Sequence, residues 1–354
     1  MRRKTPILAD LVLLGGGHAQ VAAIKNFAMN PVPGLRLTIV TGDILTPYSG
    51  MLPGYIEGIW KDNDIHIDLA HLAQFAGARL ITSACTGIDA DGQMLFFDNR
   101  PPLHFDLLSI NIGGQPDLNA IKGAKDHVIP VKPIANFQAS FETLLKTGLP
   151  EKIAVIGGGA AGCELALAIN KRWRNYGANP QITLYSRSNS LLSQMSSRAS
   201  HLMLKALYEA GVKIQLGRAV EKIDQRLIQV DSKTKKTKEI FDVCFLVSAV
   251  CPPTWLSSST LALDDNGFIA VDATLQSVSH PCVFAAGDIA TIIGNPRPKA
   301  GVFAVRAGRI LAKNLRRQIF GRRLLSWSVQ KRYLAILGTS DGSAIASWGR
   351  FGLK

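Results

Sequence analysis

Two glycine-rich turns, each between an apolar strand and a helix, constrain the fold of this chain more than any other feature. The first reads LVLLGGGHAQ over residues 11–20, and the second reads IAVIGGGAAG over residues 153–162. In a dinucleotide-binding turn the first glycine permits the bend, the second lets the pyrophosphate approach, and the third lets helix and strand pack closely. The second copy has all three, at Gly157, Gly159 and Gly162, whereas Gln20 takes the third place in the first copy. The pair of turns predicts two nucleotide-binding units.

Each turn lies inside a strand–helix–strand pattern. Strands at residues 11–14 and 35–40 flank a helix from about residue 21 to 29, and strands at residues 152–156 and 181–185 flank a helix from about residue 162 to 173. Residues 213–250 are typical of a hairpin with a charged tip at residues 233–238, and a last helix is expected from about residue 300 to 319. These patterns predict an α/β fold with two Rossmann-like domains.

Positive charge is concentrated at the C-terminal end of the chain. The net charge is +14 over 354 residues, and from Asn295 onward 13 Lys or Arg residues stand against one acid, Asp341. A charge confined to one end argues against general nucleic-acid binding. The stretch LAKNLRRQIFGRRLLSWSVQKRYLAIL mixes basic with apolar and aromatic residues. It fits either an anionic membrane surface or a solvated helix followed by a strand.

The five cysteines and seven histidines show neither metal-ligand nor disulfide spacing. No pair reads C-x-x-C and no cysteine precedes Cys85, so we predict no metal site and expect a reducing compartment. No apolar run approaches the ~20 residues that cross a bilayer. The chain starts with MRRKTPILADLVLLGGG, which is basic and then apolar like a signal peptide but has no cleavage site. We therefore interpret this start as the first strand and expect a cytoplasmic protein.

A third motif, VFAAGDIA at residues 283–290, places Asp288 just after a glycine at a strand end, where it could bind a flavin ribityl chain or cap a helix. The order of the three motifs resembles that of two-dinucleotide-binding flavoproteins, in which an NAD(P) domain interrupts an FAD domain. TPYSGMLPG, IPVKP and PKAGVFAVR further resemble the type II NADH dehydrogenase-like flavoproteins found alone or fused to selenophosphate synthase. The resemblance implies an FAD domain at residues 1–118 and 265–325, an NAD(P)-binding domain at residues 119–264, and a basic C-terminal segment at residues 326–354.

The resemblance also implies which residues contact FAD. The first turn would face the pyrophosphate, residues 48–51 would lie beside the flavin, and the last helix would direct its positive end toward reduced flavin. Residues 48–54 would equally suit a plain turn, and Lys132 a surface position. The residues assigned to FAD are Gly15, Gly17, His18, Ala19, Thr41, Tyr48, Ser49, Gly50, Met51, Cys85, Thr86, Gly113, Lys132, Gly287, Asp288, Lys299, Ala300 and Gly301.

A nicotinamide nucleotide would bind at the second turn. The usual ribose-binding acid is missing from both copies, because Thr41 stands there in the first, and Ser186 and Arg187 in the second. The serine–arginine pair could bind a 2′-phosphate or could belong to an exposed basic loop. The sequence therefore does not distinguish NADH from NADPH as the nucleotide. Glu164 would orient the nicotinamide ribose or simply sit near the helix start. The residues assigned to this nucleotide are Gly157, Gly159, Ala160, Ala161, Gly162, Glu164, Ser186 and Arg187.

The predicted function is oxidation of NADH or NADPH through FAD, with Lys132, Glu164 and Lys299 as candidate catalytic residues. A disulfide substrate would need a dithiol that the N-terminal part lacks. We therefore favour a quinone-like electron acceptor at the inner face of the membrane. The alternatives are a sulfide:quinone reductase-like enzyme that uses Cys251 and Cys282, and a flavin redox sensor or partner in selenium metabolism. The oligomeric state stays open, with a homodimer as one alternative.

Overall fold

The computed structural model describes residues 6–232, 235–247 and 249–354. Residues 1–5 of the predicted first strand, and Lys233 and Thr234 at the predicted hairpin tip, lie outside the described residues. The chain forms two compact units. Unit 1 comprises Met1–Thr46, His66–Gln115 and Val250–Val329, and unit 2 comprises Pro47–Ile65, Pro116–Ala249 and Gln330–Lys354. These units depart from the predicted cofactor domains mainly at residues 47–65, 250–264 and 330–354, and the assignment of a cofactor to each unit remains a proposal.

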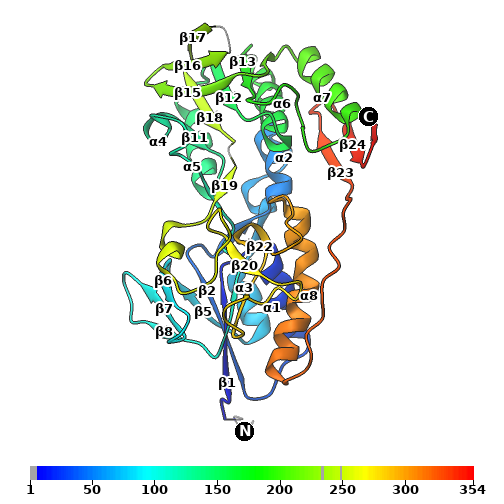
Figure 1. Cartoon of the computed structure of the whole chain (residues 1–354). Helices are drawn as coiled ribbons and strands as arrows, with labels where there is room; N and C mark the ends of the chain where they lie inside the picture. The colour runs from blue at the N-terminus through cyan, green and yellow to red at the C-terminus, as the bar shows by residue number, and fades with distance from the viewer. Residues whose placement is uncertain (1–5, 233–234, 248) are drawn as a thin grey trace. The chain divides into compact units, whose positions relative to one another are not determined.

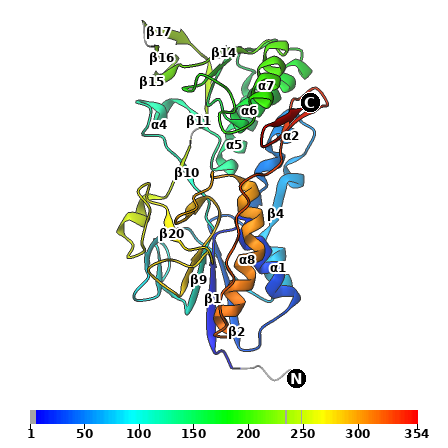
Figure 2. The same ribbon diagram turned by 45° about the vertical axis from the view of Figure 1, so that its right-hand side comes forward.

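Unit 1 is built on a five-stranded parallel sheet in the order β21-β9-β1-β2-β5. Its central strands are apolar because a parallel sheet covered on both faces has no solvated side. Helices α1 and α8 of this unit pack side by side (Figures 1 and 2). The bounds are β1 (Ala9–Leu14), β2 (Leu35–Thr41), β5 (Arg79–Thr82), β9 (Leu107–Ile110), β21 (Val283–Ala285), α1 (His18–Met29), α3 (Leu69–Ala76) and α8 (Gly301–Ile319).

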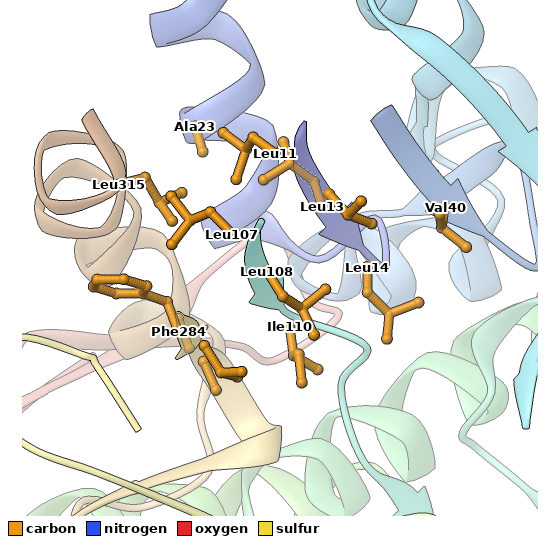
Figure 3. Packing of buried hydrophobic residues seen from close by; sticks show 14 of the residues in the cluster. Leu11, Leu13, Leu14, Ala23, Val40, Leu107, Leu108, Ile110, Phe284 and Leu315 are labelled. Carbon is orange, nitrogen blue, oxygen red and sulfur yellow. The ribbon is translucent and has the colours of Figure 1, made fainter. Parts of the chain in front are cut away.

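The core of unit 1 lies between this sheet and its helices. Figure 3 shows Leu11 and Leu13 of β1, Leu108 of β9 and Phe284 of β21 in one cluster, and each of these side chains is fully buried. Burying a side chain of this size contributes roughly 1.5–3 kcal/mol. The cluster therefore fixes β1, and with it the glycine turn that leaves its carboxyl end.

Unit 2 repeats the parallel sheet, in the order β11-β18-β12-β13-β14. The aromatic rings of Phe137, Phe141, Trp173 and Phe245 pack together in its core. Repetition of the strand–turn–helix unit in both sheets confirms the α/β fold that the sequence predicts. The bounds are β11 (Ile129–Pro130), β12 (Lys152–Ile156), β13 (Gln181–Tyr185), β14 (Lys213–Gln215), β18 (Val243–Leu246), α2 (Leu52–Glu57), α4 (Ala124–His127), α5 (Ile134–Thr147), α6 (Ala160–Asn175) and α7 (Ser197–Glu209).

The predicted hairpin within residues 213–250 forms an antiparallel meander of three strands, β15 (Ala219–Asp224), β16 (Leu227–Ser232) and β17 (Lys235–Ile240). The prediction was wrong for its flanks, because β14 and β18 belong to the parallel sheet. All four residues of β18 are buried, which suits a strand inside such a sheet and not one side of a solvated hairpin.

The C-terminal segment forms a three-stranded antiparallel sheet of β23 (Ala335–Gly338), β24 (Ala344–Trp348) and β25 (Phe351–Leu353). This sheet packs on α7 in unit 2, and the sequence pattern does not predict its three strands. None of the described helices is long and apolar enough to cross a membrane.

The remaining elements are short. The pairs β3–β4 and β10–β19 contain residues at which the chain passes from one unit to the other. Unit 1 also holds a small antiparallel sheet of β6, β7 and β8 and a parallel pair of β20 and β22. The bounds are β3 (Leu45–Pro47), β4 (His66–Asp68), β6 (Cys85–Asp89), β7 (Met94–Phe97), β8 (Leu103–His104), β10 (Gln115–Pro116), β19 (Val250–Cys251), β20 (Ile269–Val271), β22 (Ala290–Ile292), η1 (Ser49–Met51), η2 (Asp62–Ile65), η3 (Thr254–Ser258) and η4 (Gly287–Ile289).

Candidate nucleotide-binding sites

The first glycine turn leaves β1 at Gly15 and reaches α1 at His18, which brings Gly15, Gly17, His18 and Ala19 together at the carboxyl edge of the sheet. Sequence reasoning missed the residue that holds this turn. Asn111, which follows β9, accepts hydrogen bonds at Oδ1 from the backbone N–H groups of Ala19 (3.1 Å) and Gln20 (3.3 Å). Its Nδ2 donates to the carbonyl of Ala286, just before Gly287. Asn111 therefore links the first turn to the Gly-Asp motif, and a polar residue inside the apolar run LLSINI was the available signal.

Gln20 is fully buried, and the protein itself uses every polar atom of its side chain. Nε2 donates to the carbonyls of Leu14 (2.9 Å) and Ser109 (2.8 Å), while Oε1 accepts from the hydroxyl of Ser109 (2.9 Å). Where the second turn brings helix and strand together over a glycine, the first turn inserts an amide that bonds to β1 and β9. The carboxamide of Gln20 is thus used by hydrogen bonds within the protein.

The residues of unit 1 assigned to FAD outside the first turn and α8 lie on β2, β6 and η4 and in the loop after β9. Thr41 ends β2 and donates its hydroxyl to the carbonyl of Asp43 (2.7 Å), so that hydroxyl is already engaged within the chain. Cys85 and Thr86 begin β6, and burial raises the pKa of the Cys85 thiol to about 11. Gly113 follows β9 in the left-handed region, and Gly287 and Asp288 form η4.

Lys299 precedes the N-terminus of α8, where Ala300 is the cap residue and Gly301 the first helical residue. Its Nζ donates to the carbonyl of Ala290 (2.6 Å) and to the hydroxyl of Thr291 (2.9 Å), and it lies 3.8 Å from the centre of the Phe268 ring. Burial lowers the pKa of this ammonium to about 8. The cation therefore stands at the positive end of a long helix, held by its own unit.

Tyr48, Ser49, Gly50, Met51 and Lys132 belong to unit 2, unlike the rest of the FAD set. Ser49, Gly50 and Met51 form η1, and the backbone N–H of Tyr48 donates to the carbonyl of Ile65 (2.7 Å). The segment is a helical turn with a Tyr48 ring that is 41% exposed. Lys132 lies between β11 and α5 and is half-buried.

The second turn has the close packing that the sequence predicts for its third glycine. A Cβ built on Gly162 would lie 1.8 Å from the carbonyl oxygen of Gly157, so α6 and the turn approach too closely for any side chain. Gly159 differs, because a Cβ there would meet no atom within 4 Å. Ala160 and Ala161 open α6, whose cap residue offers no side-chain hydrogen bond. Free backbone N–H groups at a helix N-terminus fit a phosphate.

Ser186 and Arg187 follow β13, the strand next to the second turn. Ser186 is buried, and a Cβ on Gly158 would lie 2.4 Å from its hydroxyl oxygen, so Ser186 packs directly against the turn. Arg187 is exposed. Both residues therefore follow the second strand of the unit, and Ser186 lies directly beside the turn.

Glu164 contacts the C-terminal sheet, a partner that sequence reasoning did not foresee. Its Oε1 accepts a hydrogen bond from the backbone N–H of Gly338 in β23 (2.8 Å), and the next acid in this region, Glu57, accepts one from the hydroxyl of Ser340 (2.6 Å). Burial, aided by the charge of Glu57, raises the pKa of Glu164 to about 7. Its carboxyl group therefore changes protonation near neutral pH.

One group of potential metal ligands occurs among the described residues, at Asp10, His104 and Asp106. Sequence spacing did not predict it, since residue 10 is far along the chain from the others. Asp10 is already bound by the guanidinium of Arg36 through both carboxylate oxygens, and Asp106 accepts the backbone N–H of Asp10 (2.6 Å). These contacts account for the group as a structural ion pair at the surface.

Comparison with known proteins identifies the family. The model of the pyridine nucleotide-disulphide oxidoreductase family matches residues 9–308. An NADH oxidase of Streptococcus pneumoniae serotype 4 is 30% identical over 330 residues, which cover 86% of this chain and 69% of that protein. NDH2 from Plasmodium falciparum, solved in complex with NADH, has a TM-score of 0.84 at 15% identity, over 99% of this chain and 92% of that one.

A third similar protein is an engineered water-forming NADPH oxidase bound to NADPH, a mutant of the Lactobacillus brevis NADH oxidase. It has a TM-score of 0.79 at 22% identity and covers 96% of this chain and 75% of its own. These two structures share the fold, and the family match extends over most of the sequence. The chain therefore belongs to the pyridine nucleotide-disulphide oxidoreductase family, as an oxidoreductase that uses FAD with a nicotinamide nucleotide.

Proposed function

We propose that this protein oxidises NADH or NADPH and passes the electrons to a quinone-like acceptor. FAD supplies the redox chemistry, accepting hydride and releasing electrons onward. We assign FAD to the turn, the Gly-Asp motif and the α8 start of unit 1, and the nicotinamide nucleotide to the second turn of unit 2. The observation that carries the proposal is the second turn, where open space at Gly159 and an uncapped α6 fit a pyrophosphate.

The residues of the chain would bind and orient FAD and the nicotinamide nucleotide, and would offset negative charge on the cofactor. Asp288 would accept hydrogen bonds from the ribityl chain, and the N-terminus of α8 with Lys299 would offset negative charge on the reduced cofactor. Glu164 would orient the nicotinamide ribose, with Gly338 holding one of its carboxylate oxygens. Lys132 would lie near the flavin, as the resemblance implies.

The cysteines support an acceptor other than a disulfide. Burial raises the pKa of Cys85 to about 11 and that of Cys163 to about 12, and it raises the pKa of Cys244 as well. A buried thiol with a raised pKa stays protonated and is a poor nucleophile. Cys251 and Cys282 are partly exposed. They are the residues that a sulfide:quinone reductase-like reaction would have to use.

Rapid mixing of the purified yellow protein with each reductant tests the proposed function. We expect NADH or NADPH to bleach the flavin absorbance and a quinone to restore it with turnover. The reason is that FAD would carry electrons from the nucleotide to the quinone. A flavin that neither nucleotide bleaches contradicts the proposal. Bleaching by sulfide, lost in Cys251→Ser or Cys282→Ser, would support the sulfide:quinone alternative, whereas bleaching without turnover on any quinone would support a redox sensor.

The outer face of the C-terminal sheet supports a membrane-surface location for this reaction. Ile336 (64% exposed), Trp348 (59%), Phe351 (79%) and Leu353 (68%) alternate with buried residues on β23, β24 and β25. Register places Trp348 opposite Phe351, so the large side chains gather on one face. The neighbouring basic residues Lys331, Arg332 and Arg350 are exposed as well, whereas Lys354 is paired with Asp341 (2.7 Å). We propose that this apolar face with its basic rim contacts anionic lipid.

We expect the protein to sediment with vesicles that contain phosphatidylglycerol and to stay in solution with phosphatidylcholine vesicles, with binding weakened by salt. Replacing Trp348 and Phe351 together by Glu should lower vesicle binding about tenfold or more, because each large side chain would contribute over 1 kcal/mol in the interface. Tyr208→Glu, at a residue of α7 that is 80% exposed, is the matched control. Equal binding of the double variant and the control would contradict the assignment of this face.

The engineered NADPH oxidase carries, among its substitutions, three consecutive replacements that produce the run Ala-Arg-Ser. This chain carries Ser-Arg-Ser at residues 186–188, directly after β13. Independently of that run, we propose that the loop after β13 distinguishes NADPH from NADH, because it follows the second strand of the nucleotide-binding unit.

A further inference from the structure

A single turn of the C-terminal sheet donates hydrogen bonds to two acids of unit 2. The turn joins β23 to β24 and comprises residues 338–343. The backbone N–H of Gly338 donates to Oε1 of Glu164 (2.8 Å), and the hydroxyl of Ser340 donates to Oε1 of Glu57 (2.6 Å). Glu164 lies near the start of α6 and Glu57 ends α2, so one turn holds carboxylates from two helices.

This turn is held in shape by contacts other than those with the two acids. The carboxylate of Asp341 accepts hydrogen bonds from the hydroxyls of Thr339 (2.6 Å) and Ser343 (2.6 Å), and Lys354 donates to its second oxygen (2.7 Å). The contact with Lys354 and those with the hydroxyls hold the pKa of Asp341 well below its usual range. Ser340 has a left-handed backbone (φ 58°), which residues other than glycine adopt rarely. The turn therefore presents its two donors in one fixed arrangement.

The contact with Gly338 uses only one oxygen of the Glu164 carboxylate. Because a carboxylate has two oxygens, Oε2 can accept a hydrogen bond from a ribose hydroxyl while Oε1 stays on Gly338. The donor is a backbone group at a strand end, so it fixes the direction of the carboxylate more firmly than a mobile side chain would. Glu164 follows Gly162 of the second glycine turn by two residues. The C-terminal sheet therefore contributes to how Glu164 faces a nucleotide at that turn.

Glu57 is the acid whose charge acts on Glu164. Burial raises the pKa of Glu164 to about 7, and the charge of Glu57 adds to this effect. The hydroxyl of Ser340 points its positive end at Glu57 and so offsets part of that charge. Arg172 of α6 donates to the backbone carbonyl of Glu57 (3.5 Å). The influence of Glu57 on Glu164 therefore depends on the turn.

Other titratable groups on elements that pack against α6 are paired, buried as neutral groups or exposed. In the turn, Asp341 is paired with Lys354 (2.7 Å), and β23 carries no titratable side chain. The thiol of Cys163, next to Glu164, stays protonated because burial raises its pKa to about 12. The remaining titratable groups are Tyr55 and Tyr185, whose hydroxyls donate to Glu142 and Glu239, and the exposed residues Lys152, Lys171, Arg174, Arg198, His201, Lys205, Tyr208 and Glu209.

We propose that Glu57 and Ser340 are positioning residues for Glu164, and that through them the turn at residues 338–343 makes nucleotide binding depend on pH near neutrality. The inference rests on the proposed function, in which Glu164 orients the nicotinamide ribose. A charged Glu164 accepts a hydrogen bond from a ribose hydroxyl more strongly than a protonated one does. Because the pKa of Glu164 is raised to about 7, the affinity is full above that pH and falls as the pH drops through it.

Isothermal titration of the FAD-loaded protein with ADP-ribose tests the inference without flavin reduction. ADP-ribose carries both riboses of the nucleotide and no nicotinamide, so it reports binding alone. We expect the native protein to lose affinity about fivefold or more between about pH 8 and about pH 6. The midpoint is the pH at which half of this change has occurred. Glu164→Gln cannot ionise, so its affinity should be the same at both pH values.

Glu57→Gln and Ser340→Gly should move the midpoint in opposite directions. Glu57→Gln keeps an acceptor for Ser340 and removes the charge, so the midpoint should fall by about half a pH unit. Ser340→Gly suits the left-handed backbone and removes only the hydroxyl, so the turn should stay folded. Glu57 then acts on Glu164 without the offsetting hydroxyl, and the midpoint should rise by about half a pH unit.

The double variant and a distant acid complete the test. If Ser340 acts through Glu57, the double variant should have the midpoint of Glu57→Gln alone. Glu209→Gln, which removes an exposed acid of α7 paired with Lys205 (3.7 Å), is the matched control and should leave the midpoint in place. Absent or pH-independent binding of ADP-ribose by the native protein overturns the inference, and a midpoint that either single variant leaves unchanged overturns the role of that residue. If the midpoints shift as expected but neither NADH nor NADPH bleaches the flavin, the proposed electron transfer fails while the positioning of Glu164 stands.

Discussion

Gln20→Gly, the change that would complete the glycine pattern of the first turn, is expected to destabilise the protein and to release FAD. Gln20 is fully buried, and its amide bonds to β1 and β9 through the carbonyls of Leu14 and Ser109. Removal leaves a cavity, deprives the Ser109 hydroxyl of its acceptor, and puts glycine inside α1. Together these effects should cost about 2–4 kcal/mol of unfolding free energy.

Urea unfolding and the ratio of flavin absorbance to protein absorbance after gel filtration measure this effect. The matched control is Gln74→Ala, which removes an exposed glutamine from α3 and should leave both quantities near the native values. A Gln20→Gly protein that is as stable as the native one and keeps its flavin would show that the third position of this turn tolerates glycine. In that case the hydrogen bonds of Gln20 would not hold the first turn together.

Gly162→Ala and Gly159→Ala are expected to separate the two tasks of the second turn. The Cβ of Ala at position 162 would lie 1.8 Å from the backbone oxygen of Gly157, so α6 must move away from the turn. Displacing α6 misaligns the N–H groups that would hold the pyrophosphate. We expect binding of the nicotinamide nucleotide to weaken about a hundredfold, together with a lower melting temperature.

At position 159 the new methyl group meets no protein atom within 4 Å, and the backbone of Gly159 is extended, which any residue adopts. Gly159→Ala should therefore melt like the native protein. Its methyl group would instead occupy the space through which the pyrophosphate approaches, so we expect affinity for the nucleotide to fall about tenfold. The affinity is measured by following flavin absorbance as the nucleotide is added, and the melting temperature is measured by thermal unfolding. Unchanged affinity in Gly159→Ala would place the pyrophosphate elsewhere.

The sequence could predict the parts of the fold that depend on local pattern. An apolar run, a glycine turn and an amphipathic helix specify their elements within a few residues, so the cores of β1, β12, β13 and α8 lie where the sequence predicts them. Helix starts were less accurate, because α1 begins at His18 and α6 at Ala160, each within the turn itself. The structure also gives a physical reason for the third glycine of the second turn, because Gly162 approaches the backbone of Gly157.

Tertiary structure decided which distant residues complete each site. Asn111 meets Ala19 only because β9 pairs with β1. Glu164 meets Gly338 because the C-terminal strands fold back onto unit 2. A sequence records the spacing of residues along the chain, whereas these contacts depend on strand order and side-chain packing. The sequence by itself thus determined that the chain has two glycine turns that differ at the third position. The tertiary structure decided what Gln20 does at that position, because its buried side chain forms hydrogen bonds with β1 and β9.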